Sequence, residues 1–123
     1  MKIINNESTV FFDIDNTLVM WKMSKTGVSA SVKVTCPYHG DIYELKKHLG
    51  HIKILKDRKA RGSFIVVWSA AGFAWAEAVI KALNLELYVD LIMTKPHAYV
   101  DDKQAAEFMG ERIYLEIDDS YGQ

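Results

Sequence analysis

The chain has 123 residues, of which 50% are hydrophobic and 25% charged, and its formal net charge is −1. This length suits one domain with one hydrophobic core, and the balanced charge excludes a disordered polyelectrolyte or a protein held to nucleic acid or membrane by overall charge. The single cysteine, Cys36, excludes an intramolecular disulfide, and no cysteine and histidine set has zinc-site spacing. Because the sequence has no apolar run of membrane-spanning length and no secretory leader, we expect a soluble, cytoplasmic protein with one domain over residues 1–123.

The first expected element is a buried strand that ends in two acids. The apolar residues Val10, Phe11 and Phe12 run directly into Asp13 and Asp15, which share one face of the strand. Two carboxylates this close repel each other unless a cation lies between them or one of them keeps its proton. The pattern therefore predicts a metal site or acid–base chemistry.

Residues 20–47 have the pattern of an inserted β-hairpin. Apolar and polar residues alternate over 28–35, which is the period of a strand. The sequence over 37–41 is typical of a turn, and 42–46 suits a returning strand. Such a hairpin either covers a neighbouring site as a flap or minimal cap, or it shields a sheet edge, and the sequence leaves both interpretations open.

The rest of the chain alternates helical patterns with short apolar runs. The expected elements are a helix over 50–61, a strand over 64–68, a helix over 73–83, a strand over 89–93, an apolar segment over 97–100, a short helix over 103–109 and a strand over 112–117. This order predicts an α/β fold with an open, mainly parallel, Rossmann-like sheet flanked by helices.

Polar side chains lie at four expected strand ends, where the apolar segment over 97–100 counts as a strand. Ligands of such sheets collect at the carboxyl ends of the strands. Acidic oxygens suit Mg²⁺, a serine before a helix suits a phosphate oxygen, and a lysine offsets the charge that develops in phosphoryl transfer. Together they predict covalent phosphoryl transfer to an aspartate. The residues are Asp13 with Asp15, Ser69, Lys95, and Asp101 with Asp102.

In this order the motifs resemble those of the haloacid dehalogenase-like (HAD) superfamily of phosphohydrolases. The first family motif, Asp-x-Asp-x-Thr, is matched by residues 13–17, and the second, a Ser or Thr that ends an apolar strand, by Ser69. The third, a lysine, is matched by Lys95, and the fourth, an acidic pair, by residues 99–102. Lys103 is an alternative third motif, and the pair at 118–119 competes as the fourth.

The resemblance implies a role for each residue. Asp13 would be the nucleophile that forms an aspartyl phosphate, and Asp15 would protonate the leaving group and then activate water. Lys95 would take part in catalysis and, like the other phosphate-binding residues, hold the transferring group. The phosphate-binding set would be Thr17, Ser69, Ala70 and Lys95. The magnesium ligands would be Asp13, Asp15 through its backbone carbonyl, Asp101 and Asp102.

The expected partner is a phosphorylated substrate, either a small molecule or an exposed phosphate on a macromolecule, with nucleic acid only in the role of substrate. The basic residues on the outer face over 53–61 slightly favour a polyanionic substrate. Two other function classes stay open. One is a phosphoaspartyl receiver-like signalling domain, although the strand that ends at Ser69 lacks the acceptor aspartate of that class. The other is a catalytically silent binding module with the same fold.

Overall fold

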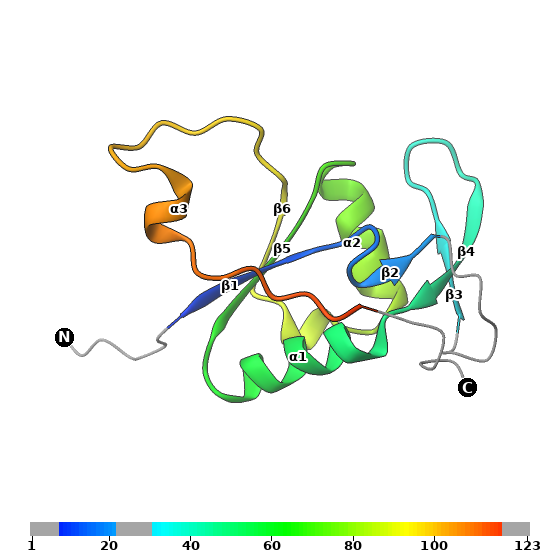
Figure 1. Cartoon of the computed structure of the whole chain (residues 1–123). Helices are drawn as coiled ribbons and strands as arrows, with labels where there is room; N and C mark the ends of the chain where they lie inside the picture. The colour runs from blue at the N-terminus through cyan, green and yellow to red at the C-terminus, as the bar shows by residue number, and fades with distance from the viewer. Residues whose placement is uncertain (1–7, 22–30, 117–123) are drawn as a thin grey trace.

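The computed structural model describes residues 8–21 and 31–116, and Figure 1 shows how their helices and strands are arranged. At the centre lies a parallel sheet of three strands in the order β1-β5-β6. The strands are β1 (Thr9–Asp13), β5 (Phe64–Ser69) and β6 (Leu91–Thr94). Helices α1 (Leu49–Ala60) and α2 (Phe73–Ala82) connect and flank them. The molecule is thus an α/β protein with a parallel sheet, which is compatible with a Rossmann-like fold.

The main core lies between one face of this sheet and the two helices. Phe12 of β1 and Ile65 and Val67 of β5 point to the same face and pack with buried residues of α1 and α2, among them Leu55 and Val79. The continuous apolar sequence of β5 is explained by its central position, because Val66 on the opposite face is also only 2% exposed.

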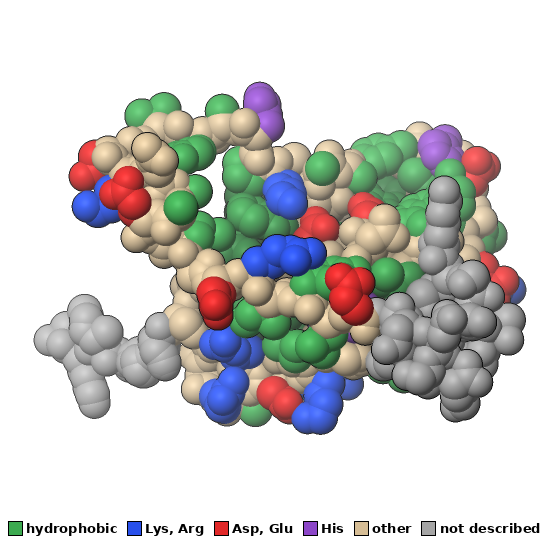
Figure 2. All heavy atoms as spheres, in the orientation of Figure 1, with side chains coloured by type: hydrophobic (Ala, Val, Ile, Leu, Met, Phe, Trp, Pro, Cys, Tyr) green, Lys and Arg blue, Asp and Glu red, His purple; other side chains and the backbone are tan. Residues whose placement is uncertain are grey.

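The opposite face of the sheet is more open. Phe11, Phe64 and Leu91 are 37%, 45% and 46% exposed, and the Phe11 and Trp68 rings lie 4.3 Å apart between centroids. Figure 2 shows hydrophobic side chains in the hollow between this part of the molecule and the segment that carries α3 (Ala105–Phe108). The open face leaves the carboxyl ends of the strands accessible from this side.

A second, antiparallel sheet stands beside the first, in the order β2-β4-β3. Its strands are β2 (Val19–Met20), β3 (Ser31–Thr35) and β4 (Ile42–Lys47), and residues 36–41 form the turn between β3 and β4. Val34 and Leu45 are buried in the main core, and β3 packs against α2. The antiparallel pair therefore lies next to the loop that leads into α2. The beginning of the hairpin expected over 28–35 falls partly outside the described residues.

Two expected strands are wrong where the structure describes them. Residues 97–100 form no strand, and Val100 is fully exposed. A parallel neighbour requires a crossover of a dozen or more residues, whereas only residues 95–96 separate β6 from the segment over 97–100. Residues 112–116 also form no strand, because histidine rings bind the backbone of Leu115.

The remaining differences are at element ends. The last strand expected over 112–117 includes residue 117, which lies outside the described residues. The short helix is limited to α3, and β6 begins two residues later than the sequence predicts. Within residues 8–21 and 31–116, no helix is long and apolar enough to cross a membrane.

Candidate active site

A tight turn after β1 separates the first two acids. The carbonyl oxygen of Ile14 accepts hydrogen bonds from the backbone N–H groups of Thr17, Leu18 and Val19 at 3.2, 2.9 and 3.2 Å. Asn16 has a φ of 61°, in the left-handed region that asparagine adopts more readily than most residues. Ile14 and Leu18 are completely buried, so they anchor the turn in the core. The acids on either side of Ile14 consequently meet different partners.

Asp13, the last residue of β1, faces a lysine and a threonine. Its Oδ2 accepts a hydrogen bond from Thr17 Oγ1 at 3.2 Å, and its Oδ1 lies 3.9 Å from Lys95 Nζ. The Lys95 and Asp13 side chains are 43% and 34% exposed. The Lys95 ammonium also lies 5.8 Å from the centroid of the Trp68 ring, which restricts the position of the lysine stem. The structure thus brings together Asp13, Thr17 and Lys95, three of the residues that the sequence singles out.

Asp15 has a separate set of hydrogen-bond donors, all of them neutral. Its Oδ1 accepts from the indole N–H groups of Trp21 at 2.8 Å and Trp75 at 2.9 Å, and its Oδ2 accepts from Ser69 Oγ at 3.3 Å. Hydrogen bonds to a charged acceptor are stronger than those between neutral groups, so these donors orient the carboxylate. Asp15 is therefore held by the ends of β2, β5 and the first turn of α2.

The two tryptophans are functional candidates that none of the sequence motifs singled out. A buried indole N–H requires an acceptor, and Trp75, which is buried, follows shortly after the strand that ends at Ser69. Trp21 follows the first motif by a similarly short distance. This nearness to strand ends was the signal available in the sequence, but only the fold shows that one carboxylate serves both indoles.

Ser69 is completely buried and links the site to the loop before α2. Its Oγ accepts a hydrogen bond from the backbone N–H of Ala71 at 3.0 Å, in addition to donating to Asp15. Its carbonyl oxygen accepts from the N–H groups of Gly72 and Lys95. Gly72 has a φ of 109°, and a side chain there would collide with Tyr38 Oη, so this position requires glycine. Ser69 and its neighbour Ala70, both expected to bind phosphate, lie at this strand end.

The acidic pair expected as the fourth motif lies apart from these residues. Asp101 and Asp102 are exposed, and Asp101 Oδ1 accepts a hydrogen bond from the backbone N–H of Lys103 at 2.9 Å. The segment after β6 carries them away from the strand ends, toward the side of the molecule opposite the β3–β4 pair (Figure 1). Among the described residues, no group of three or more His, Cys, Asp or Glu side chains is placed to hold a metal ion. The structure does not assemble the expected four-residue ligand set, because no strand holds the pair at the sheet. The alternative pair at 118–119 lies outside the described residues.

Two stacked histidines at the start of α1 support the turn after β1. The rings of His48 and His51 are parallel within 7°, with centroids 3.6 Å apart, and both side chains are buried. His51 Nε2 accepts a hydrogen bond from the N–H of Leu115 at 2.8 Å, so its Nδ1 carries the proton and donates to the Thr17 carbonyl at 2.7 Å. His48 Nδ1 accepts from the His51 N–H, and its Nε2 donates to the Leu115 carbonyl.

The burial of His51 also changes its acid–base behaviour. Desolvation lowers the pKa of His51 below its ordinary value of 6.5; the hydrogen bond to the Thr17 carbonyl opposes this shift, and the nearby His48 adds to it. A proton on Nε2 would also displace the Leu115 N–H. The neutral ring is thus the form that fits the fold, and it positions the loop that carries both acids.

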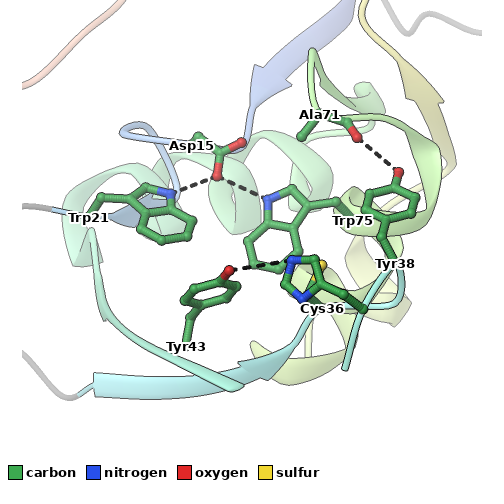
Figure 3. Close-up of a pocket in the computed structure, with 8 residues that line it drawn as sticks. Asp15, Trp21, Cys36, Tyr38, Tyr43, Ala71 and Trp75 are labelled. Carbon is green, nitrogen blue, oxygen red and sulfur yellow. Dashed lines mark hydrogen bonds between the residues drawn. The ribbon is translucent and has the colours of Figure 1, made fainter. Parts of the chain in front are cut away.

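A pocket of about 270 Å³ opens beside Asp15, between the β3–β4 turn and the start of α2 (Figure 3). The Tyr38 hydroxyl donates to the Ala71 carbonyl at 2.8 Å, which connects the turn to the loop after β5. Most of the lining is aromatic. The lining residues are Asp15, Trp21, Cys36, Tyr38, His39, Tyr43, Ala71 and Trp75.

No protein-family model matches the chain, and neither a curated protein nor a solved structure matches it significantly.

Proposed function

We propose that this chain is a magnesium-dependent phosphatase that hydrolyses a phosphomonoester through an aspartyl phosphate on Asp13, in the manner of the HAD-like phosphohydrolases it resembles. The observation that carries the proposal is the surroundings of Asp13. A strand-end carboxylate stands beside an ammonium and a hydroxyl group, while a second carboxylate two residues later is held by different donors. A nucleophile and a separate acid–base group are the two components that this chemistry needs.

The donor chemistry of Asp13 fits magnesium. Mg²⁺ is commonly held by one or two carboxylates, with water and substrate phosphate completing its octahedron, so a partly exposed strand-end carboxylate suits it. Asp13 and the backbone carbonyl of Asp15 would hold the ion, while Asp101 and Asp102 do not belong to this donor set. When bound, the ion would reduce the repulsion between a carboxylate and a phosphate group.

Each side chain then has a defined task. An oxygen of Asp13 attacks phosphorus and the bond to the leaving oxygen breaks, while the Lys95 ammonium offsets the negative charge on the transferring group. Asp15 gives its proton to the leaving oxygen and later takes one from the water that attacks the aspartyl phosphate, which releases inorganic phosphate. Since Asp15 Oδ1 already accepts two indole N–H groups, the proton belongs on Oδ2, where the Ser69 hydroxyl can rotate to accept it.

We assign the β3–β4 hairpin the role of a minimal cap over this site. Its turn is tied to the loop after β5 by the Tyr38 hydroxyl, and it forms one wall of the pocket beside Asp15. This placement favours a role at the site over the alternative in which the hairpin only shields a sheet edge.

The test is phosphate release from a panel of phosphomonoesters with and without Mg²⁺, for the wild type and for Asp13→Asn. We expect magnesium-dependent turnover that falls at least about 10³-fold in the variant, because loss of a nucleophile removes the covalent route. Asp57→Asn makes the same chemical change at an exposed position of α1 and should keep full activity. An inactive wild type, or equal rates for wild type and Asp13→Asn, would refute the proposal.

The same assay separates a phosphatase from a receiver-like domain. A receiver would incorporate phosphate from a small acyl phosphate and retain it, whereas a phosphatase releases it. If phosphate from the acyl phosphate stayed on Asp13 and none was released, the result would support the signalling interpretation instead.

A further inference from the structure

The pocket beside Asp15 is built mainly from aromatic rings. The rings of Trp21, Tyr43 and Trp75 contact one another in tilted and edge-to-face arrangements, with centroids 5.0, 6.0 and 6.2 Å apart. Tyr38 and His39 from the β3–β4 turn add to the lining. Figure 3 shows that the labelled rings come from the hairpin, the end of β2 and the first turn of α2; they are those of Trp21, Tyr38, Tyr43 and Trp75. The lining therefore offers edge-to-face contacts that suit another aromatic ring.

The volume limits what can enter. A cavity of about 150 Å³ holds one benzene molecule, whereas whole small-molecule sites usually occupy about 300–1,000 Å³. The present pocket of about 270 Å³ lies between these values, so it accommodates a single ring with a short linker. It is thus suited to one part of a ligand.

The polar groups of the lining are already engaged. The Trp21 and Trp75 N–H groups donate to Asp15, the Tyr38 hydroxyl donates to the Ala71 carbonyl, and the Tyr43 hydroxyl lies 3.5 Å from His39 Nε2. A ligand with many hydrogen-bonding groups, such as a nucleobase, would leave them unpaired inside the pocket, which is costly. An apolar ring has no such groups to satisfy.

Asp15 connects the pocket to the proposed reaction. The group that occupies a pocket next to the proton donor is the one attached to the leaving oxygen. We infer that the pocket binds the leaving group of the substrate, and that this group is an uncharged aromatic alcohol; the inference rests on the proposed phosphatase activity and specifies its substrate class.

The hydrogen bonds that Asp15 already accepts also discriminate between charged and uncharged leaving groups. An anionic group would lie against the Asp15 carboxylate. A cationic group would lose its water without gaining a free partner, because the Asp15 oxygens already accept three hydrogen bonds. An uncharged ring makes edge-to-face contacts with this lining and carries no charge that must be stripped of water. The aromatic ring of the leaving group would also contact the rings of Trp21, Tyr43 and Trp75, which further favours an aromatic alcohol over an aliphatic one.

Four esters of primary alcohols test the inference with little difference in leaving-group acidity: 2-phenylethyl phosphate, its aliphatic counterpart 3,3-dimethylbutyl phosphate, the cationic choline phosphate, and the anionic phosphate ester of 3-hydroxypropanoate. We expect kcat/KM for 2-phenylethyl phosphate to exceed that for the two charged esters at least tenfold, with the aliphatic ester between them. One misplaced methylene in an apolar pocket already changes kcat/KM by about 10–200-fold.

Substitution of the lining provides the second measurement. Tyr43→Leu should reduce the preference for the phenyl ester over the aliphatic one at least threefold. Tyr88→Leu is a matched control, because Tyr88 is also a half-buried tyrosine packed on the core, but it lies beside Lys56 of α1 and away from the pocket. It should leave the preference unchanged.

The outcomes distinguish this inference from the proposed function. Equal, Asp13-dependent rates on all four esters, or a preference for choline phosphate, would overturn the leaving-group assignment and leave the phosphatase intact. Hydrolysis of none of them, together with inactivity on other phosphomonoesters, would overturn the phosphatase and the assignment together. The wild-type series decides the matter even if the Tyr43 variant does not fold.

Discussion

The surroundings of Asp13 and Asp15 differ sharply, although only Ile14 separates the two residues in the chain. Asp13 lies beside a cation on the open side of the strand ends, where Lys95 is 43% exposed. Asp15 accepts hydrogen bonds from neutral donors and borders an aromatic pocket. The same residue type at one strand end is thereby suited to two tasks, attack on phosphorus for Asp13 and proton transfer for Asp15.

The largest effect beyond loss of the nucleophile should come from Asp15→Asn. Asparagine can still accept the indole N–H groups through its carbonyl oxygen but cannot carry the proton, so we expect kcat for an alkyl ester to fall about 10²–10⁴-fold. An ester of an acidic phenol such as 4-nitrophenyl phosphate needs no protonation of its leaving group, so aspartyl-phosphate formation should be much less impaired, as measured by the pre-steady-state burst. An equal loss of burst rate with both esters would contradict the acid role and remove the contrast between the two carboxylates.

A smaller effect should follow from removal of the cation beside Asp13. Lys95→Met keeps an apolar stem of similar length but removes the charge, and we expect kcat/KM to fall about 10²-fold, as for loss of one group that stabilises transition-state charge. The steady-state rate at several ionic strengths is the measurement. Lys53→Met, at an exposed ion pair with Asp57 on α1, is the matched control and should be silent. Comparable activity of Lys95→Met and wild type would show that attack by Asp13 does not need this lysine.

The smallest expected effect concerns the turn that separates the two acids. It is a change in the pH dependence of the free energy of unfolding. The pKa of His51 is lowered in the folded protein, so the unfolded chain binds this proton first as the pH falls through the ordinary value of 6.5. The free energy of unfolding is therefore greatest above this pH and decreases below it, by at most about 1.4 kcal/mol per pH unit for one proton, until the lower folded-state pKa is reached.

Urea denaturation between pH 7.5 and pH 5 measures this dependence. His51→Gln should be less stable at pH 7.5 and should lose part of the decrease at lower pH, since it removes the titrating ring that joins the Thr17 and Leu115 backbones. His97→Gln, at an exposed position after β6, serves as the control and should follow the wild-type curve. A wild-type stability that rises as the pH falls from 7.5 to 5 would contradict the assignment of a neutral, buried His51.

Much of the parallel sheet could be predicted from the sequence. The strands over β1 and β5, the end of β5 at Ser69 and the helices on either side of β5 are confirmed, because a strand buried on both faces reads as a continuous apolar run and a helix as an apolar stripe. The expected strand over 97–100 did not form because the connection from β6, residues 95–96, is too short for a parallel crossover. An apolar run alone does not reveal whether the chain can return to the sheet.

The candidate site was predicted in part. Asp13, Thr17 and Lys95 do meet at the strand ends, and Asp15 and Ser69 are hydrogen-bonded to each other. Asp101 and Asp102 do not join them, because their position depends on the strand that is not formed. The contribution of Trp21 and Trp75 could not be anticipated, because they are far apart in the chain and only the packing of the hairpin against α2 brings their N–H groups to one carboxylate.

The sequence by itself determined which residues could carry the chemistry, because strand ends and turns are local and are encoded by neighbouring residues. It therefore placed Asp13 and Asp15 at the end of a buried strand. Only the tertiary structure decided that they differ, since their partners come from distant parts of the chain: Lys95 for Asp13, and Ser69 and Trp75 for Asp15. Burial and hydrogen bonding depend on these long-range contacts, and they determine how each carboxylate can act.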